Sequence, residues 1–198
     1  MKTHNMEQGS PEWFAVRAGK MTASHAQEIG NRGKGLQTYI YEILASKHAG
    51  VEEERYTNSH LERGVELEPV ARSMYELQKG VTIDQVGFIE YNKYIGCSPD
   101  GLIGEDGGIE IKCHNNAQHF RLLVNGAEDI DTRYLWQIQM NLLITGREWW
   151  DYVAYNPNFK DDLLIFRIRP SENKHKSLLE GLEVGKKLIL EIEKKLKK

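Results

Sequence analysis

The hydrophobic pattern of this 198-residue chain changes its period near the middle, and that change does most to limit the folds open to it. Upstream, apolar residues recur with the spacing of amphipathic helices, whereas residues 81–91 (VTIDQVGFIEY) and 93–98 (KYIGCS) are typical of strands. Residues 104–108 supply a glycine-rich turn, and 109–113 (IEIKC) alternates as a third strand. The middle of the chain therefore predicts antiparallel strands joined by tight turns.

Start and stop signals place helices on both sides of these strands. Ser10-Pro11 is an N-cap followed by proline at the first helical position, and Gly50 ends another helix. Pro69 lies inside a long helical pattern, where its missing N–H predicts a kink or a second helix start. Helices are predicted from Pro11, from Thr22 to near Gly30, and over residues 36–49, 59–79, 132–145 and 171–198, with two further strands at 148–155 and 162–169. This order predicts a single α/β (α+β) domain over residues 1–198, with a mixed central β-sheet flanked by helices.

Composition excludes several classes of protein. The chain is 40% hydrophobic and 28% charged, as in ordinary globular domains, and no apolar run is long enough to span a membrane. The start, MKTHNMEQGSPEW, lacks the apolar stretch of a secretory signal, so we expect a cytoplasmic protein. Cys97 and Cys113 cannot supply a four-cysteine zinc or iron–sulfur site and are expected on buried strands. The net charge of −3 argues against a DNA-coating protein but leaves local DNA contacts open, because the distribution of charge matters more than its sum.

The strongest chemical pattern lies between the predicted strands. Asp100 directly follows one strand, and Glu110 and Lys112 alternate on the next, where residues two apart share a face. Ile109 and Ile111 point the other way, into the core. A hairpin between Asp100 and Glu110 would join two carboxylates, which with the Ile111 carbonyl form an oxygen cage suited to Mg²⁺ or Mn²⁺. A lysine beside such ions can stabilise the charge developing on a phosphodiester and orient the attacking water. Glu-x-Lys alone is more often a cross-strand ion pair, so the preceding Pro-Asp-Gly carries much of the prediction.

These residues resemble known nucleases at two levels. Pro99-Asp100 followed by Glu110-x-Lys112 resembles the signature of the PD-(D/E)XK nuclease superfamily, which implies a restriction-endonuclease-like core. Four segments together resemble the lambda exonuclease, or YqaJ-type viral recombinase, family and stand in its order: Trp13 with Arg17-Ala-Gly-Lys-Met-Thr-Ala-Ser24, Gly64-Val-Glu-Leu-Glu68, Cys97-Ser-Pro-Asp-Gly-Leu102 with Glu110-Ile-Lys112, and Gln137-Ile-Gln139. The chain departs from that pattern at His114, where relatives often have proline, and we expect a local change there without loss of chemistry.

The resemblance implies a role in the metal site for each matching residue. Asp100 would bridge two metal ions, Glu110 would ligate one of them, and Glu68 would complete the second site. Lys112 would assist the attacking water, and Gln137 would contact that water or the metal shell. Taken singly, Glu68 is more often a helix-surface acid, and Gln137 is equally explained as an ordinary boundary residue.

A second group of residues resembles the family's pocket for the 5′ phosphate at a DNA end. This group consists of Arg17, Ser24 and Ser98. An arginine presents a fork of donors that fits phosphate, and hydroxyl and backbone donors near a helix start add to it. The simpler explanations are that Arg17 pairs with a surface acid and that Ser24 caps a helix.

The resemblance as a whole implies a Mg²⁺-dependent exonuclease, with Mn²⁺ as a possible substitute and two ions per active site. It would degrade one strand of linear double-stranded DNA from the 5′ end to 5′-mononucleotides, leaving a 3′ single strand for phage-type recombination. Family members form ring-shaped homotrimers around DNA and work with a single-strand annealing protein, here in the bacterial host cytoplasm. The alternatives are an endonuclease of the same superfamily, which needs no 5′-phosphate pocket, and a non-catalytic DNA-end binding scaffold, which needs no intact acids. The superfamily's iron–sulfur nucleases are disfavoured by the two cysteines.

Overall fold

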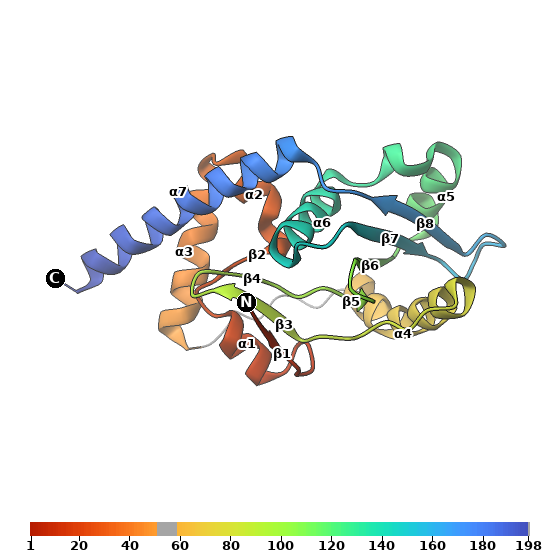
Figure 1. The fold of residues 1–198 in the computed structure, drawn as a ribbon, viewed down its shortest axis with the longest axis horizontal. Coiled ribbons are helices and arrows are strands. Elements are labelled where there is room, and N and C mark those ends of the chain that lie inside the picture. Colours follow the sequence, from red (N-terminus) through yellow and green to blue (C-terminus); the bar gives the residue numbers. More distant parts are fainter. Residues whose placement is uncertain (51–58, 198) are drawn as a thin grey trace.

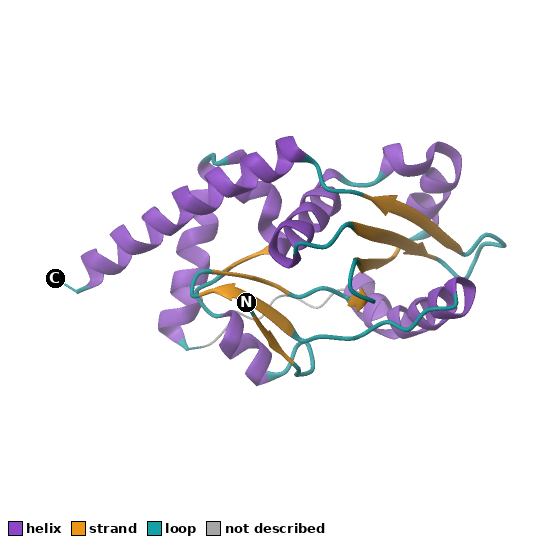
Figure 2. Ribbon diagram, in the orientation of Figure 1, coloured by secondary structure: helices purple, strands orange, loops and turns teal. Residues whose placement is uncertain are grey.

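The computed structural model describes residues 1–50 and 59–197, apart from the side chains of residues 59–62. Helices enclose the strands on several sides (Figure 2). In chain order the elements are β1 (Lys2–His4), α1 (Pro11–Arg17), β2 (Met21–Thr22), the 3-10 turn η1 (Ala23–His25), α2 (Ala26–Asn31), α3 (Lys34–Ala49), α4 (Ser59–Lys79), β3 (Phe88–Asn92), β4 (Ile95–Cys97), β5 (Gly101–Ile103), β6 (Gly107–Cys113), α5 (Asn116–Asn125), the 3-10 turn η2 (Gly126–Asp129), α6 (Thr132–Thr145), β7 (Trp149–Tyr155), β8 (Leu163–Ile168) and α7 (Glu172–Leu196).

The strands form two mixed four-stranded sheets, in the orders β1-β3-β4-β2 and β5-β6-β7-β8. The predicted α/β class is confirmed, and the structure divides the predicted central sheet in two. The division falls where the chain passes from β4 to β5 through Pro99, which has no N–H to donate to a ladder. β5 pairs antiparallel with β6, and β6 pairs parallel with β7. The two sheets therefore meet at the segment that carries Asp100.

One predicted strand is shorter in the structure, and two of its elements, β1 and α5, were not predicted. The strand expected over 81–91 is shorter, because only Phe88–Asn92 pairs with neighbours and Asp84 makes an isolated bridge to Leu102. The three-residue strand β1, paired with β3, is too short to show a hydrophobic period. Helix α5 was not predicted either, although Asn115 caps it by accepting a hydrogen bond from the Gln118 N–H.

Helices cover both faces of the β5–β8 sheet (Figure 1). Ala71 and Tyr75 of α4 pack on one face against a cluster that includes Ile109 and Ile111, which confirms the predicted inward direction of those two isoleucines. On the other face, α5 and α6 pack against a second cluster that includes Trp150, Tyr152 and Ala154. Because Glu110 pairs in register with Tyr152, and Lys112 with Ala154, both functional side chains lie on the face covered by α6.

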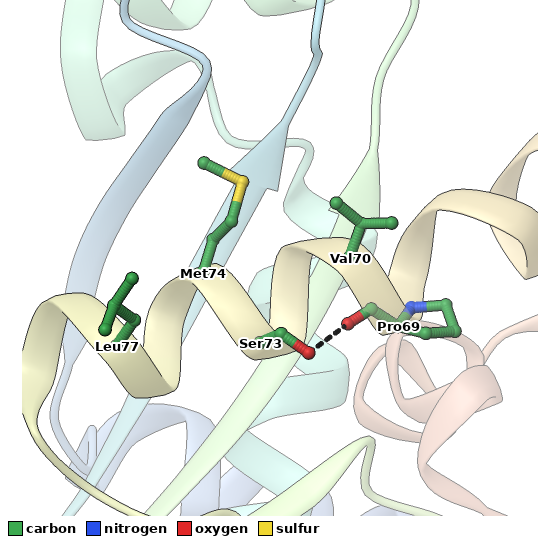
Figure 3. Close-up of a pocket in the computed structure, with 5 residues that line it drawn as sticks. All are labelled: Pro69, Val70, Ser73, Met74 and Leu77. Carbon is green, nitrogen blue, oxygen red and sulfur yellow. Dashed lines mark hydrogen bonds between the residues drawn. The ribbon is translucent and has the colours of Figure 1, made fainter.

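Helix α4 runs without interruption through Pro69, so the predicted second helix start is wrong. Pro69 is exposed, and water can satisfy the carbonyl that its missing N–H leaves free. The Ser73 hydroxyl donates to the Pro69 carbonyl at 3.0 Å. Figure 3 shows these two residues with Val70, Met74 and Leu77, which line a shallow, largely apolar hollow of about 440 Å³ along the helix.

Helix α7 packs across α2 and α3 and then continues away from the rest of the molecule (Figure 1). Leu178, Leu182 and Ile189 bury its apolar stripe in the cluster shared with those helices. Gly181 lets the helices approach closely, since a Cβ there would lie 1.9 Å from the Ile29 carbonyl oxygen. Within residues 1–50 and 59–197, no helix is both long and apolar enough to span a membrane.

Candidate active site

The candidate site lies where β5 stops pairing with β6. The last paired residues are Gly101 and Ile109, so the following part of β6 has an edge that β5 does not cover. The Asp100 carboxylate occupies this edge, because its Oδ2 accepts a hydrogen bond of 2.7 Å from the Ile111 N–H. The Asp100 side chain thus takes the hydrogen-bonding place that a backbone carbonyl of β5 would otherwise fill. This bond fixes the Asp100 carboxylate beside Glu110 and Lys112.

Lys112 links the two carboxylates predicted to converge. Its Nζ lies 2.6 Å from Glu110 Oε1 and 3.9 Å from Asp100 Oδ2. Glu110 is fully buried, whereas Lys112 and Asp100 retain side-chain exposures of 25% and 14%. The two less buried groups therefore form the part of the site that a substrate can reach.

Helix α6 supplies two amides that hold Glu110. Gln137 Nε2 donates to Glu110 Oε1 at 2.6 Å, and Asn141 Nδ2 donates to Oε2 at 3.4 Å. The sequence analysis singled out Gln137 but missed Asn141, whose position one turn later on an otherwise apolar helix was the available signal. Gln139 has different contacts: its Nε2 donates to the Arg169 carbonyl, and its Oε1 accepts from the N–H of Ser171, the N-cap of α7.

Glu68 reaches the site from α4. It pairs with Arg72 one turn along the helix, and Arg72 Nη2 also donates to the Asp100 carbonyl at 3.4 Å. Burial and the nearby Asp100 carboxylate raise the pKa of Glu68 despite the positive charge of Arg72. The structure thus brings together all four charged residues that the sequence assigned to the metal site and to water activation.

The electrostatics of this cluster are unfavourable to the ionised acids. Burial, followed by the charge of Asp100, raises the pKa of Glu110 to about 8, and these effects outweigh the attraction of Lys112. Burial lowers the pKa of Lys112, but Glu110 and Asp100 outweigh it and the net shift is upward. The Lys112 ammonium and the Arg72 guanidinium therefore face three carboxyl groups, so the acids still outnumber the cationic side chains. Among the described residues, however, no three His, Cys, Asp or Glu side chains already stand in a metal-holding arrangement.

Arg17 and Ser98 meet in a second cluster, built on α1. The Ser98 hydroxyl accepts hydrogen bonds from Arg17 Nη1 at 3.2 Å and from Trp13 Nε1 at 2.9 Å. The Arg17 guanidinium also stacks 3.9 Å above the Trp13 ring. Since Ser98 precedes Asp100 by two residues, this cluster adjoins the carboxylates along the chain.

Ser24 lies in the neighbouring segment. Its hydroxyl is 3.1 Å from the Thr22 hydroxyl, and the Thr22 N–H donates to the Tyr39 hydroxyl at 2.9 Å. Strand β2, which contains Thr22, pairs parallel with β4 and so runs beside the strand that leads to Ser98. Ser24 is exposed and does not cap a helix, because η1 and α2 begin after Thr22 and His25 respectively.

An aromatic group borders Lys112 on the α6 side. The Lys112 Nζ lies 5.3 Å above the Tyr134 ring, and Tyr134 stacks on Tyr152 with ring centroids 5.9 Å apart. His114, where the family often has proline, is buried with its Nε2 2.6 Å from the Tyr152 hydroxyl. Sequence reasoning missed Tyr134, although it stands three residues before Gln137 on the same helix face.

The domain therefore has an α/β fold with two acids and a lysine at a sheet edge. These are the side chains that metal-assisted hydrolysis of a phosphodiester uses. The YqaJ-like viral recombinase domain matches residues 12–148 of the chain. Two solved structures of the alkaline exonuclease LHK-Exo from Laribacter hongkongensis are similar over nearly their whole length. The one in complex with dAMP is 32% identical with a TM-score of 0.83, covering 93% of this chain and 95% of that one. The other is 31% identical with a TM-score of 0.81, covering 94% and 98%.

A phage-related exonuclease from Haemophilus somnus shares the fold, at 14% identity and a TM-score of 0.71, with 89% and 96% of the two chains covered. The comparison with curated proteins found no match. The extent of the family match and the identity to LHK-Exo decide the assignment. This chain belongs to the YqaJ-like viral recombinase family, and the predicted resemblance is confirmed.

Proposed function

We propose that the protein is a Mg²⁺-dependent exonuclease that degrades one strand of linear duplex DNA in the 5′-to-3′ direction. The products would be 5′-mononucleotides and a 3′ single strand suited to recombination by strand annealing. The observation that carries this proposal is the meeting of Glu68, Asp100, Glu110 and Lys112 at the open edge of β6. The similarity to an alkaline exonuclease supports the same reaction.

The donor set at this edge fits a hard divalent cation. Glu68, Asp100 and Glu110 offer carboxylate oxygens, which Mg²⁺ and Mn²⁺ prefer. In a β-strand, the N–H and the carbonyl of one residue point to the same edge of the strand. The Ile111 carbonyl therefore points to the edge at which the Ile111 N–H donates to Asp100. The upward pKa shift of Glu110 also fits, because a bound cation would favour the ionised carboxylate. Two ions held here would neutralise the phosphate and activate water.

Lys112 and Gln137 act in the proposed site without binding a metal ion themselves. Lys112 presents an ammonium held at 2.6 Å from Glu110, and we infer that it stabilises charge developing on the phosphate and orients the attacking water. Gln137, proposed from the sequence to contact that water or the metal shell, donates to Glu110. We therefore infer that Gln137 acts by fixing the Glu110 carboxylate.

The cluster of Arg17 and Ser98 supports the proposed direction of digestion. A guanidinium and a hydroxyl bind phosphate well, and Ser24 adds an exposed hydroxyl on the neighbouring segment. A terminal 5′ phosphate held by these groups would place the next phosphodiester near Asp100, two residues beyond Ser98. Ser98 would then bind the end and Asp100 would take part in hydrolysis two residues later on the same segment.

We further propose the assembly that the resemblance implies: a homotrimeric ring that works with a single-strand annealing protein in the bacterial cytoplasm. A ring would convert weak phosphate contacts into processive digestion, because the retained strand cannot diffuse away. Sedimentation equilibrium tests this part directly, since a trimer predicts three times the monomer mass and a monomer would contradict it.

The activity itself is tested by incubating three DNAs with the protein in Mg²⁺ or in EDTA. These are a linear duplex with 5′ phosphates, the same duplex with 5′ hydroxyls, and a closed circle. We expect rapid loss of one strand of the phosphorylated duplex in Mg²⁺, slower loss without the phosphate, and an intact circle. Cleavage of the circle would indicate an endonuclease, and binding without digestion would indicate an end-binding scaffold.

A further inference from the structure

Arg72 occupies an unusual place for an arginine that pairs along a helix. It follows Glu68 by one turn of α4, and only 12% of its side chain is exposed. A surface pair at this spacing contributes about 0.3–0.5 kcal/mol. Arg72 Nε is buried without a hydrogen-bond partner among the described residues. Such burial costs more than an ordinary surface pair returns, so helix stability alone does not account for Arg72.

The contacts of Arg72 join two separate elements of the site. Nη2 binds Glu68 Oε1 on α4 and also lies 3.4 Å from the carbonyl oxygen of Asp100, just before β5. The Asp100 carboxylate is held from its other side by the Ile111 N–H. Arg72 is therefore the side chain through which the helix-borne acid and the strand-borne acid are held relative to each other.

We propose that Arg72 is a positioning residue that sets the spacing between Glu68 and Asp100 for a divalent cation. The inference rests on the proposed function, because it gives Arg72 a task within the proposed metal site. Arg72 binds one carboxylate oxygen of Glu68, and the other oxygen remains for the cation. Both contacts come from the single nitrogen Nη2, which the rigid plane of the guanidinium holds in place, whereas a lysine ammonium ends a flexible stem without that plane.

Two effects of opposite sign decide what removing Arg72 does to metal affinity. Loss of its positive charge strengthens cation binding, whereas loss of its contacts leaves Glu68 and Asp100 free to move apart. Residues that orient metal ligands typically contribute 10- to 100-fold in affinity. Arg72 is largely buried, so its charge is only partly screened, and in Arg72→Gln the first effect reduces the loss expected from the second. We expect the positioning effect to be the larger of the two, and it acts alone in Arg72→Lys, which keeps the charge.

The experiment measures Mn²⁺ binding to the full chain by calorimetry, without DNA, at a temperature well below unfolding. Wild type, Arg72→Gln and Arg72→Lys are compared with Arg121→Gln. This control also removes a paired arginine, which contacts Asp129 at 3.1 Å on the exposed side of α5. We expect Mn²⁺ affinity to fall roughly 10- to 100-fold in both Arg72 variants. The control should bind as wild type does.

Each other outcome identifies which idea has failed. Wild-type affinity in Arg72→Gln overturns the positioning role and leaves the metal site standing, as does tighter binding. Weak binding in Arg72→Gln but wild-type binding in Arg72→Lys also overturns it, because charge alone would then be sufficient. Absence of Mn²⁺ binding by wild type overturns the metal site, and with it the inference. Thermal unfolding of each variant with EDTA separates a purely structural loss, which would lower stability without altering affinity.

Discussion

Stability of the metal-free protein should decrease as the pH rises, and Glu110 should be a main cause. Its pKa is raised from 4.5 to about 8 in the folded chain, chiefly by burial. A carboxyl group with a raised folded pKa contributes its stability fully below the ordinary value and loses it as pH rises through the folded value. The free energy of unfolding in EDTA should therefore fall between about pH 5 and pH 9.

The size of this effect follows from the shift. Each pKa unit corresponds to about 1.4 kcal/mol, so the full shift of Glu110 corresponds to roughly 5 kcal/mol as an upper value. Glu68 changes stability in the same direction, because its pKa is also raised. The upward pKa shift of Lys112 keeps that side chain charged throughout this range, so its own titration does not oppose the trend. Saturating Mg²⁺ or Mn²⁺ should flatten the profile by favouring the ionised acids.

The variant Glu110→Gln isolates the contribution of this residue. A neutral amide resembles the protonated acid, and the buried Asn141 Oδ1, which lacks a partner among the described residues, could accept its N–H after rotation. Urea denaturation in EDTA should give similar stabilities for variant and wild type at pH 5, with the variant more stable by several kcal/mol at pH 9. Glu128→Gln, at an exposed position, should retain the wild-type profile. Parallel profiles for wild type and Glu110→Gln would refute the reasoning.

Three further changes test other parts of the structure. Arg17→Gln should remove the preference for a 5′-phosphorylated end while digestion of 5′-hydroxyl DNA continues, as measured by initial rates on the two substrates. Asp151→Ala should destabilise the fold by roughly 3 kcal/mol in urea denaturation, because it leaves the buried Tyr75 hydroxyl without its 2.7 Å acceptor. Gly181→Ala should lower the melting temperature, since the added Cβ would meet the Ile29 carbonyl oxygen at 1.9 Å.

Local patterns in the sequence predicted much of the fold. The apolar spacing of the helix predicted at 132–145 and the alternation in the strand predicted at 109–113 depend on neighbours within a few residues, and α6 and β6 confirm both. The isolated three-residue strand β1 and the helix α5 lacked such a pattern. The break between the two sheets at Pro99 could be suspected from the proline, but its position depends on which strands pair.

In the candidate site too, residues with a local sequence pattern were predicted, and residues that depend on tertiary contacts were not. Glu110 and Lys112 could be placed on one face from their spacing alone, and the resemblance added Glu68 and Gln137 from distant helices. Arg72 could not be predicted, because its contact with Asp100 joins residues 28 apart. Asn141 offered only its place one turn after Gln137, which does not show its contact with Glu110, 31 residues away. Such contacts depend on tertiary packing, and no local periodicity reports them.

The most direct test of the central claim compares wild type with Asp100→Asn on a 5′-phosphorylated linear duplex in Mg²⁺. Asparagine retains an oxygen that can accept the Ile111 N–H but removes the carboxylate charge. Digestion should fall by roughly 100-fold or more, since metal stabilisation of charge is worth several kcal/mol and about 1.4 kcal/mol is a factor of ten. Binding to the DNA end should remain measurable. Digestion by Asp100→Asn at the wild-type rate would contradict the account.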